Sequence, residues 1–349
     1  MFQPKYQITD LALKYLIQIS EYRTMILNAK LIPKWELNLR KEALLRSTHA
    51  STSIEGNSLS LEEVTDLMIG RDVTALVKDK QEVLNYFRSL EELNSLTSEK
   101  KPRLENDDIL HLHSIITKGV IKDAAHEGSY RSGKQYVLLR NRGTGEVTFL
   151  PPPTDQVPQL MNDLIDWING NQSSVLDPVL EAAVVHYEFV RIHPFLDGNG
   201  RTARTLATLI LIRRSFDTKR FFALDDFYNS DRPRYYQMLR SVHQDEYDLT
   251  HWLEYFCEGV AVSMKAVKQK IESLGNKKKD AANDMQIALD FEQIKVVEFV
   301  TKNGSIQNRQ VRELLRVSNK KAYQLLQKLV ALKVLASQGA GRNLKYISR

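Results

Sequence analysis

Cysteine is almost absent from this chain of 349 residues, in which Cys257 stands alone. A single cysteine cannot close an intrachain disulfide, and such sparse usage is typical of a reducing compartment. No apolar run approaches the roughly 18 residues that a membrane-spanning helix needs. The first ten residues also lack the basic and then apolar order of a secretory signal. These absences predict a cytoplasmic protein without a membrane segment.

The chain also lacks the G-x-x-x-x-G-K-[ST] pattern of a Walker P-loop. A different glycine-rich segment is present at residues 193–204, which read HPFLDGNGRTAR. We expect Asp197 to Gly200 to form a turn and a helix to begin at Arg201. Backbone N–H groups gathered at such a turn attract anions, phosphate above all.

Charged and titratable side chains surround this turn. Arg201 and Arg204 lie three residues apart on one helix face, so two guanidinium groups can reach two phosphates. Asp197 offers hard oxygen ligands for a Mg²⁺ ion that is shared with phosphates. His193 can accept a proton from an incoming hydroxyl group. The segment therefore indicates a phosphate site with a general base beside it.

Residues 193–204 match every specified position of the Fic signature, HPFx(D/E)GNGRxxR, so the chain resembles the Fic family. The resemblance extends over about residues 51–270 and implies a mainly α-helical, Fic-type bundle with a β-hairpin flap. It implies a protein adenylyltransferase, an enzyme that transfers AMP from ATP to a Tyr, Thr or Ser hydroxyl of a protein, the chain itself included. In that family His193 would be the catalytic base and Asp197 the Mg²⁺ ligand. The nucleotide-binding residues would be Gly198, Asn199, Gly200, Arg201, Thr202, Ala203, Arg204 and Asp231, the last standing about where relatives often carry asparagine.

A second, shorter match lies upstream, where Ser51, Glu55 and Gly56 resemble the family's inhibitory motif, (S/T)xxxE(G/N). Glycine at this point favours the end of a helix, where a carboxylate calls for a cationic neighbour. The resemblance implies that Glu55 pairs with Arg204 and blocks the γ-phosphate site, so that the enzyme is autoinhibited. In some relatives this glutamate instead orients a water molecule for the reverse reaction, de-AMPylation. The sequence leaves both roles open.

Residues 135–139 and 147–150 predict two short strands joined by a turn. The edge of such a hairpin can bind an extended protein segment through main-chain hydrogen bonds. The resemblance implies that this hairpin, about residues 135–150, is the flap on which a protein substrate docks. The alternative is a structural hairpin that covers the core.

Three other histidines are assigned no chemistry. His111 and His113 occupy one predicted helix and point apart, which argues against a metal pair, so we expect surface or core positions for them. His186 lies on the apolar helix that leads to His193. We expect it to be a core histidine hydrogen-bonded to the backbone.

Positive charge is concentrated near the C-terminal end. The chain has a net charge of +6, whereas residues 265–349 contain 18 Lys or Arg against 7 Asp or Glu. The rest of the chain is therefore mildly acidic. Such a basic segment favours an acidic partner, with nucleic acid first, although a solvated basic surface would have the same composition.

The pattern of this basic segment resembles a winged helix-turn-helix domain. Three helical stretches, at about 285–303, 307–315 and 319–332, precede two short strands at 334–337 and 344–347. The third helix of such a domain commonly enters the DNA major groove. It would carry Lys320, Lys321 and Lys328, with Arg342 and Lys345 on or near the wing. This helix has no arginine for reading guanine, so DNA binding and a role in protein docking or homodimerisation both remain open.

These patterns predict an N-terminal helical region with the inhibitory motif (1–100), a Fic catalytic domain (101–271), a linker (272–284) and a winged-helix domain (285–349). Two other functions remain open. One is a transcription regulator that senses nucleotide, and the other is a Fic enzyme with a different nucleotide donor. Because His193 and Asp197 are both present, the sequence favours an enzyme.

Overall fold

A computed structural model describes residues 2–348 except 98–102, 134–138, 141–146, 171–174, 218, 243–245, 281–288, 290, 316, 340 and 342–343. The chain divides into two units, and each is described by itself. The first comprises Met1–Asn28 and Arg40–Glu272. The second comprises Ala29–Leu39 and Ser273–Arg349.

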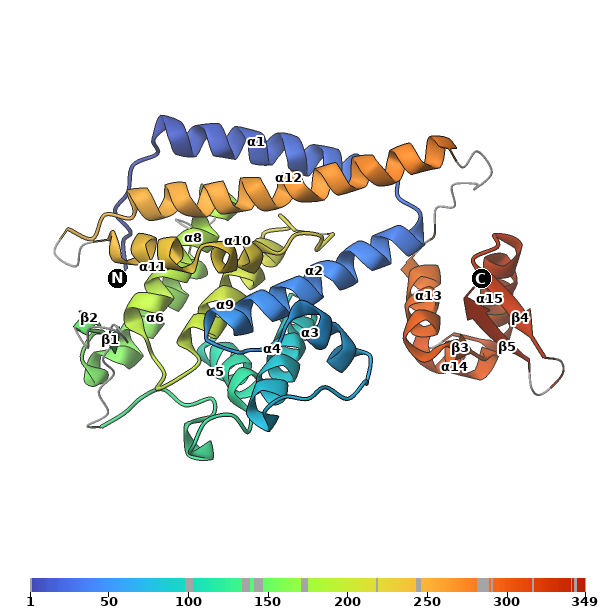
Figure 1. The fold of residues 1–349 in the computed structure, drawn as a ribbon, viewed down its shortest axis with the longest axis horizontal. Coiled ribbons are helices and arrows are strands. Elements are labelled where there is room, and N and C mark those ends of the chain that lie inside the picture. Colours follow the sequence, from blue (N-terminus) through green and yellow to red (C-terminus); the bar gives the residue numbers. More distant parts are fainter. Residues whose placement is uncertain are drawn as a thin grey trace. The chain divides into compact units, whose positions relative to one another are not determined.

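Helices make up most of the first unit (Figure 1), which confirms the predicted mainly α-helical fold. The α-helices are α1 (Asp10–Asn28), α2 (Pro33–Ile54), α3 (Leu61–Met68), α4 (Val77–Leu96), α5 (Asn106–Thr117), α6 (Val157–Ile168), α8 (Pro178–Ile192), α9 (Asn199–Arg213), α10 (Leu224–Ser230), α11 (Arg232–Arg240) and α12 (Thr250–Asp280). Two short 3₁₀ helices, η1 (Ala124–His126) and η2 (Thr154–Gln156), lie in the connections. α2 begins and α12 ends in segments of the second unit.

The core of this unit is built around α8 and α9. α8 is mostly apolar and is buried along most of its length, as expected for a central helix. An aromatic cluster from α10, α11 and α12 packs against it around His186. The expected backbone bond of His186 is wrong, because its Nε2 lies 3.0 Å from the Tyr235 hydroxyl instead. Trp252 completes the packing and donates from Nε1 to the Ala183 carbonyl at 2.8 Å.

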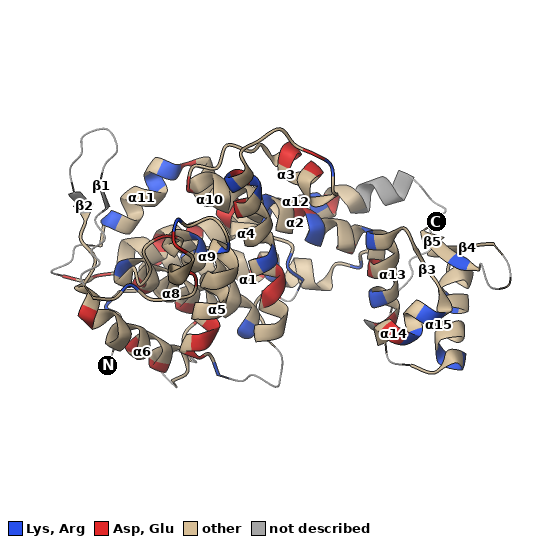
Figure 2. Cartoon of the chain, turned by 90° about the horizontal axis from the view of Figure 1, so that it is seen from below, with Lys and Arg blue, Asp and Glu red and all other residues tan. Residues whose placement is uncertain are grey.

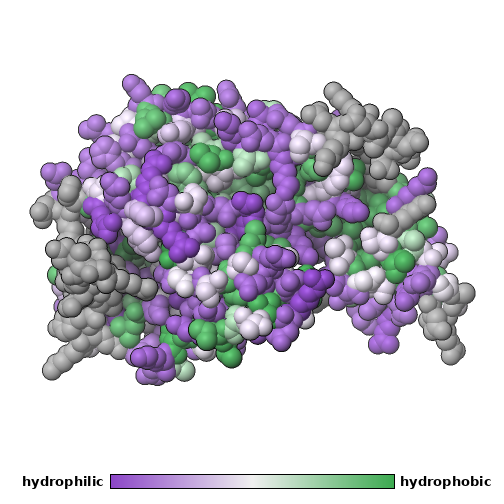
Figure 3. All heavy atoms as spheres, in the orientation of Figure 1, coloured by the Kyte–Doolittle hydropathy of each residue, from purple (hydrophilic) through white to green (hydrophobic). Residues whose placement is uncertain are grey.

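α1 and α12 run alongside each other, the blue and orange helices of Figure 1. The Thr9 hydroxyl donates to Glu254 at 2.6 Å, and the Lys268 ammonium lies 5.5 Å from the ring centre of Tyr22. α12 continues to Asp280, so the start of the predicted linker at residue 272 is helical. The face seen in Figure 3 is largely hydrophilic, with hydrophobic residues scattered across it. No helix among the described residues is long and apolar enough to cross a membrane.

The predicted hairpin is described in part. β1 (Leu139–Arg140) pairs antiparallel with β2 (Val147–Phe149), with Leu139 opposite Phe149. The rest of the first predicted strand and the connecting turn lie outside the described residues.

Besides the start of α2 and the end of α12, the described residues of the second unit form three helices and a small antiparallel sheet. Its elements are α13 (Phe291–Asn303), β3 (Ser305–Ile306), α14 (Asn308–Leu315), α15 (Asn319–Ala331), β4 (Leu335–Gln338) and β5 (Lys345–Ser348), with strand order β3-β5-β4. Apolar side chains from all three helices and the sheet form its core, and Leu37 packs against them. Ser318 caps α15 by accepting from the Lys321 N–H at 3.3 Å. β3 was not predicted, because two residues are too few to show an alternating pattern.

The buried contact between α8 and the turn that follows predicts a large stability effect. Phe189 is fully buried, and its ring lies 6.1 Å from that of Phe195. Phe189→Ala should lower the free energy of unfolding by about 3–5 kcal/mol, because it removes apolar contacts and leaves a cavity. Urea denaturation followed by circular dichroism measures this change. The control, Leu13→Ala, removes a side chain that is 49% exposed on α1 and should change stability by at most about 0.5 kcal/mol. Equal effects of the two substitutions would contradict the placement of the core.

Candidate active site

The glycine-rich turn joins the two central helices. α8 ends at Ile192, and His193 follows in a left-handed conformation with φ of 49°. α9 begins at Asn199, two residues earlier than predicted, after Gly198 with φ of 79°. A Cβ atom at Gly198 would lie 2.8 Å from Cγ2 of Thr117. Both the backbone conformation and the close approach of α5 therefore favour glycine at this position.

Side chains within the turn hold it closed. The Asn199 amide bonds both the N–H and the carbonyl of Phe195, at 2.9 and 2.8 Å. The N–H and the hydroxyl of Thr202 both donate to the Gly198 carbonyl at 2.9 Å. Thr202 and Ala203 are fully buried, and their predicted part in nucleotide binding stays a prediction.

The first turn of α9 leaves N–H groups for a ligand. A helix cannot bond its first N–H groups internally, and here they belong to Asn199, Gly200 and Arg201. Together with the helix dipole they favour an anion at this end of α9.

His193 is partly buried beside this turn. Its Nδ1 lies 3.2 Å from the Val190 carbonyl, an acceptor that requires the proton on Nδ1 and leaves the Nε2 lone pair free to accept one. Burial lowers the pKa of His193 to about 4, and the charge of Arg131 adds to this effect. The bond to Val190, Glu55 and Asp197 act in the opposite direction. The ring is therefore neutral near pH 7, as a general base must be.

Arg204 is buried and bound by the end of α2. Its Nη2 lies 2.8 Å from Oε1 of Glu55, so the structure contains the ion pair that the sequence predicted. Nε of Arg204 donates to the Ser51 hydroxyl at 2.7 Å, and Nη2 donates to the Ser51 carbonyl at 3.0 Å. Burial alone would raise the pKa of Glu55, but Arg204 and Arg201 outweigh it and lower the pKa. Glu55 is therefore charged throughout the neutral pH range.

The Glu55 carboxylate also lies against the first turn of α9. A Cβ atom at Gly200 would overlap with Oε1 of Glu55 and would come within 3.2 Å of an Arg204 nitrogen. The carboxylate therefore occupies space directly beside the N–H groups that favour an anion.

A second carboxylate accompanies Arg204. Oδ1 of Asp225 lies 3.5 Å from Nε of Arg204, and Asp225 is 4% exposed. Burial raises the pKa of Asp225 to about 6, although Arg204 opposes this rise. Arg204 thus has a counter-charge within the first unit that does not depend on Glu55.

Arg201 is held by carboxylates on both sides. It lies 3.4 Å from Glu82 of α4 and 3.3 Å from Asp197. Its Nε and Nη1 are buried and have no hydrogen-bond partner in the described part of the chain. Glu82 also accepts from the Asn57 amide at 3.1 Å, which connects Arg201 to the segment after Glu55. Arg201 therefore retains N–H donors for an anionic ligand.

Asp197 is the exposed acid of the turn, with a side chain that is 56% exposed. No group of three or more His, Cys, Asp or Glu that could hold a metal occurs among the described residues. A single exposed carboxylate beside an anion site instead fits Mg²⁺, which is usually held by one or two carboxylates and by substrate phosphates.

Asp231 lies at the junction of α10 and α11. Its exposed carboxylate caps α11 by accepting from the Arg234 N–H at 3.1 Å. The adjacent Arg232 donates to the Ser53 hydroxyl at 2.7 Å, two residues before Glu55. Asp231 therefore caps the start of α11, the helix whose Arg232 contacts α2.

Sequence reasoning missed two residues that hold the turn from outside. His113 is buried, and its ring stacks on Phe195 with centres 3.5 Å apart. Its Nδ1 accepts from the Gly128 N–H at 3.0 Å, and Nε2 lies 2.9 Å from the Asp197 carbonyl. Arg131 bonds the backbone around His193. Because both contacts join distant parts of the chain, no local spacing marks these residues.

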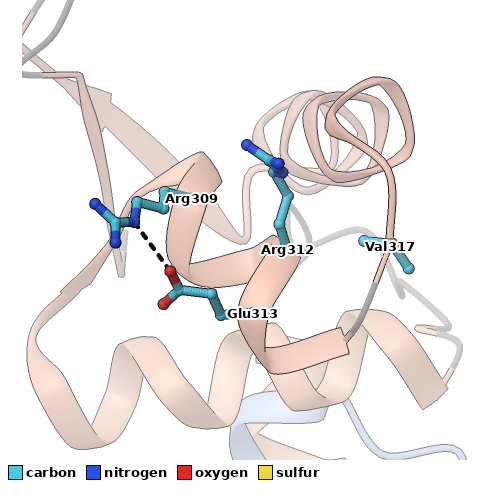
Figure 4. Close-up of a pocket in the computed structure, with 4 residues that line it drawn as sticks. All are labelled: Arg309, Arg312, Glu313 and Val317. Carbon is cyan, nitrogen blue, oxygen red and sulfur yellow. Dashed lines mark hydrogen bonds and ion pairs between the residues drawn. The ribbon is translucent and has the colours of Figure 1, made fainter.

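A shallow pocket of about 330 Å³ lies in the second unit (Figure 4). It is lined by Arg309, Arg312 and Glu313 of α14 and by Val317. Arg309 and Glu313 point toward each other and form an ion pair at 2.9 Å. The pocket is basic and open, and it is separate from the glycine-rich turn in the chain.

Comparisons with known proteins find similar sequences among curated proteins. The protein adenylyltransferase fic-1 of Caenorhabditis elegans is 32% identical to this chain over 181 residues, which are 51% of this chain and 34% of that protein. The protein adenylyltransferase Fic of Nematostella vectensis is 30% identical over 216 residues, which are 60% of this chain and 47% of that protein. The chain thus spans between a third and a half of the length of these curated relatives.

Solved structures show the same fold. A Fic family protein from Desulfovibrio desulfuricans G20 superposes with a TM-score of 0.65 at 24% identity, covering all of this chain and 98% of that chain. Fic-1 from C. elegans superposes with a TM-score of 0.62 at 25% identity, covering 77% of this chain and 74% of that chain. Residues 103–211 match the Fic/DOC family. This chain therefore contains a Fic domain of the Fic/DOC family.

Proposed function

We propose that the chain is a protein adenylyltransferase that Glu55 holds inactive. The observation that carries this proposal is the 2.8 Å ion pair between Glu55 and Arg204, formed beside an anion-attracting helix end. The relatives that match half or more of this chain are named protein adenylyltransferases, which supports the proposed activity.

His193 supplies the base. Its free Nε2 accepts the proton of a Tyr, Thr or Ser hydroxyl on the protein substrate, and that oxygen attacks the α-phosphate of ATP. The new O–P bond forms as the bond to pyrophosphate breaks, and AMP remains on the substrate. General-base assistance of this kind typically contributes ~10²–10⁴-fold to the rate.

The phosphates bind at the start of α9. The N–H groups of Asn199, Gly200 and Arg201 contact phosphate oxygens, while Arg201 and Arg204 neutralise the β- and γ-phosphates. Asp197 would hold Mg²⁺, which offsets the negative charge that develops on the phosphates.

Glu55 inhibits by occupying Arg204. With that guanidinium engaged, the γ-phosphate loses its anchor and the α-phosphate lies out of line with the attacking oxygen. A misplacement of order 1 Å can cost ~10²-fold in rate. The protein substrate docks on the hairpin of β1 and β2, so that its hydroxyl faces His193.

Removing the Glu55 carboxylate should activate the protein. Glu55→Gly is expected to raise transfer of label from α-labelled ATP to protein by about 10²-fold, because Arg204 becomes free for the γ-phosphate. The double variant Glu55→Gly/His193→Ala should lose this gain by ~10²–10⁴-fold. Gel autoradiography of the purified protein, alone and with a cell lysate as acceptor, measures both effects.

The matched control is Glu62→Gln, which changes an exposed glutamate of α3 and should leave labelling at the wild-type level. Unchanged labelling in a correctly folded Glu55→Gly variant would contradict inhibition by Glu55. If that variant binds ATP but labels no protein, the nucleotide-sensing alternative is favoured. Label from another nucleotide would indicate a different donor.

The role of Asp197 predicts a changed metal requirement. In the Glu55→Gly background, Asp197→Asn should raise the Mg²⁺ concentration for half-maximal labelling by at least about tenfold, because substitutions even beyond the direct ligands of a metal cost ~10–100-fold. A Mg²⁺ titration at fixed ATP measures this change. Asp107→Asn alters an exposed acid of α5 and serves as the control. Identical Mg²⁺ dependence of the two variants would exclude Asp197 as the ligand.

We further propose that the second unit is a winged helix that binds DNA. Figure 2 shows Lys and Arg on α14 and α15, and the exposed face of α15 carries Lys320, Tyr323 and Lys328. Lys321 forms an ion pair with Glu292 at 2.5 Å, and Arg342 lies outside the described residues. Lysines can neutralise phosphates without selecting a base sequence.

This proposal predicts weak, salt-dependent DNA binding by the full chain. The slope of log K against log salt should fall by about 1 for Lys320→Ala, because one phosphate contact is lost. Fluorescence anisotropy with a labelled duplex, measured over a salt series, gives the slope. Lys14→Ala, on α1 of the first unit, is the control. A slope that neither variant changes would favour a protein-docking role for the second unit.

A further inference from the structure

We propose that Arg131 is a positioning residue that holds His193 at a fixed distance from the hairpin on which the protein substrate docks. This inference rests on the function proposed above. It concerns a residue that touches neither the nucleotide site nor the attacking hydroxyl.

Arg131 binds three consecutive carbonyl groups at the end of α8. Its Nε donates to the His193 carbonyl at 2.9 Å, and its Nη2 lies 3.2 Å from the Ile192 carbonyl. Its backbone N–H donates to the Pro194 carbonyl at 2.8 Å. Carbonyls at the end of a helix lack partners within it, and a cation there also favours the helix dipole. Arg131 therefore fixes the backbone at and around His193.

The same guanidinium binds the chain that returns from the hairpin. Nη2 donates to the Pro152 carbonyl at 2.6 Å, and Nη1 donates to the Thr154 hydroxyl at 2.7 Å. Pro152 follows three residues after Phe149, the last residue of β2. One planar group thus bridges the base and the exit of the hairpin. Both parts must be aligned when a docked hydroxyl meets Nε2 of His193.

The conformation of His193 explains why such a bridge is needed. Its φ of 49° is uncommon for a residue with a side chain and must be stabilised by its surroundings. Arg131 is 3% exposed, so its bonds to the 192–194 carbonyls form away from solvent. A lysine could keep the charge but could not reproduce this fork of donors.

Arg131 also acts on His193 through its charge. The charged groups that affect His193 are Arg131, which lowers its pKa, and Glu55 and Asp197, which raise it. Removing the Arg131 charge should therefore raise the pKa of His193 toward its usual value. The acid limb of the pH–rate profile should move to higher pH in the same variant.

The test compares Arg131→Gln and Arg131→Lys in the Glu55→Gly background. Both should reduce the rate of AMP transfer by about 10²-fold, since the distance between base and hydroxyl is no longer fixed. The dissociation constant for a fluorescent ATP analogue should change by less than about twofold, because Arg131 contacts no predicted nucleotide-binding side chain. Arg131→Gln should move the acid limb upward, whereas Arg131→Lys should leave it in place.

The matched control is Arg23→Gln. Arg23 likewise donates to consecutive backbone carbonyls, those of Ser215 at 2.7 Å and Phe216 at 2.9 Å, beyond the end of α9. The substitution Arg23→Gln removes the same charge and the same kind of backbone contact, but at a site that does not involve His193. Its transfer rate and acid limb should match those of the parent.

Proton NMR titration of His193, assigned with His193→Gln, measures its pKa independently of activity. Each of three results would overturn the proposal. The first is an unchanged pKa of His193 in Arg131→Gln, and the second is a transfer rate within about threefold of the Arg23→Gln control. The third is an equal loss of ATP affinity and of transfer rate. If the Glu55→Gly parent transfers no AMP, the proposed enzyme function fails. The NMR titration then still decides whether Arg131 acts on His193.

Discussion

The buried charge of Arg204 is the constraint on which the rest of the site depends. A guanidinium away from water requires opposite charge and hydrogen-bond acceptors close by. Here they come from two elements, with Ser51 and Glu55 at the end of α2 and Asp225 on α10. Because α9 places this charge one turn from the glycine-rich turn, the helices that neutralise it must gather around that turn.

The sequence predicted the parts of the site that lie close together in the chain. The turn before α9 and the helices on either side follow from the local pattern. The Glu55–Arg204 pair, which joins distant residues, was expected only from the resemblance of two short motifs to the Fic family. The sequence did not indicate His113, Arg131, Glu82 or Asp225, which reach the turn across tertiary contacts. It also placed the start of the linker within α12 and assigned the wrong partner to His186, because a pattern of apolar positions does not identify a hydrogen-bond acceptor.

The same limit applies to the fold. The helices expected at 307–315 and 319–332 match α14 and α15 to within one residue at each end, because the spacing of apolar side chains shows which face of a helix is buried. β3 was missed because a two-residue strand exists through its pairing with β5. Leu37 packs in the core of the second unit although more than 200 residues of the chain separate it from Ser273, where the main segment of that unit begins. Such contacts depend on the whole chain.

The position of Asp225 affects how readily Glu55 can leave Arg204. A buried arginine whose sole counter-ion departed would be left as an uncompensated charge, and the closed state would then be very hard to leave. Asp225 lies 3.5 Å from Arg204 and gives the guanidinium a second counter-ion besides Glu55. In the proposed mechanism, the glutamate and a γ-phosphate would therefore compete as two anions for a cation that already has a counter-ion. Inhibition would then depend on the concentration of nucleotide, because the effective concentration of the tethered glutamate is fixed.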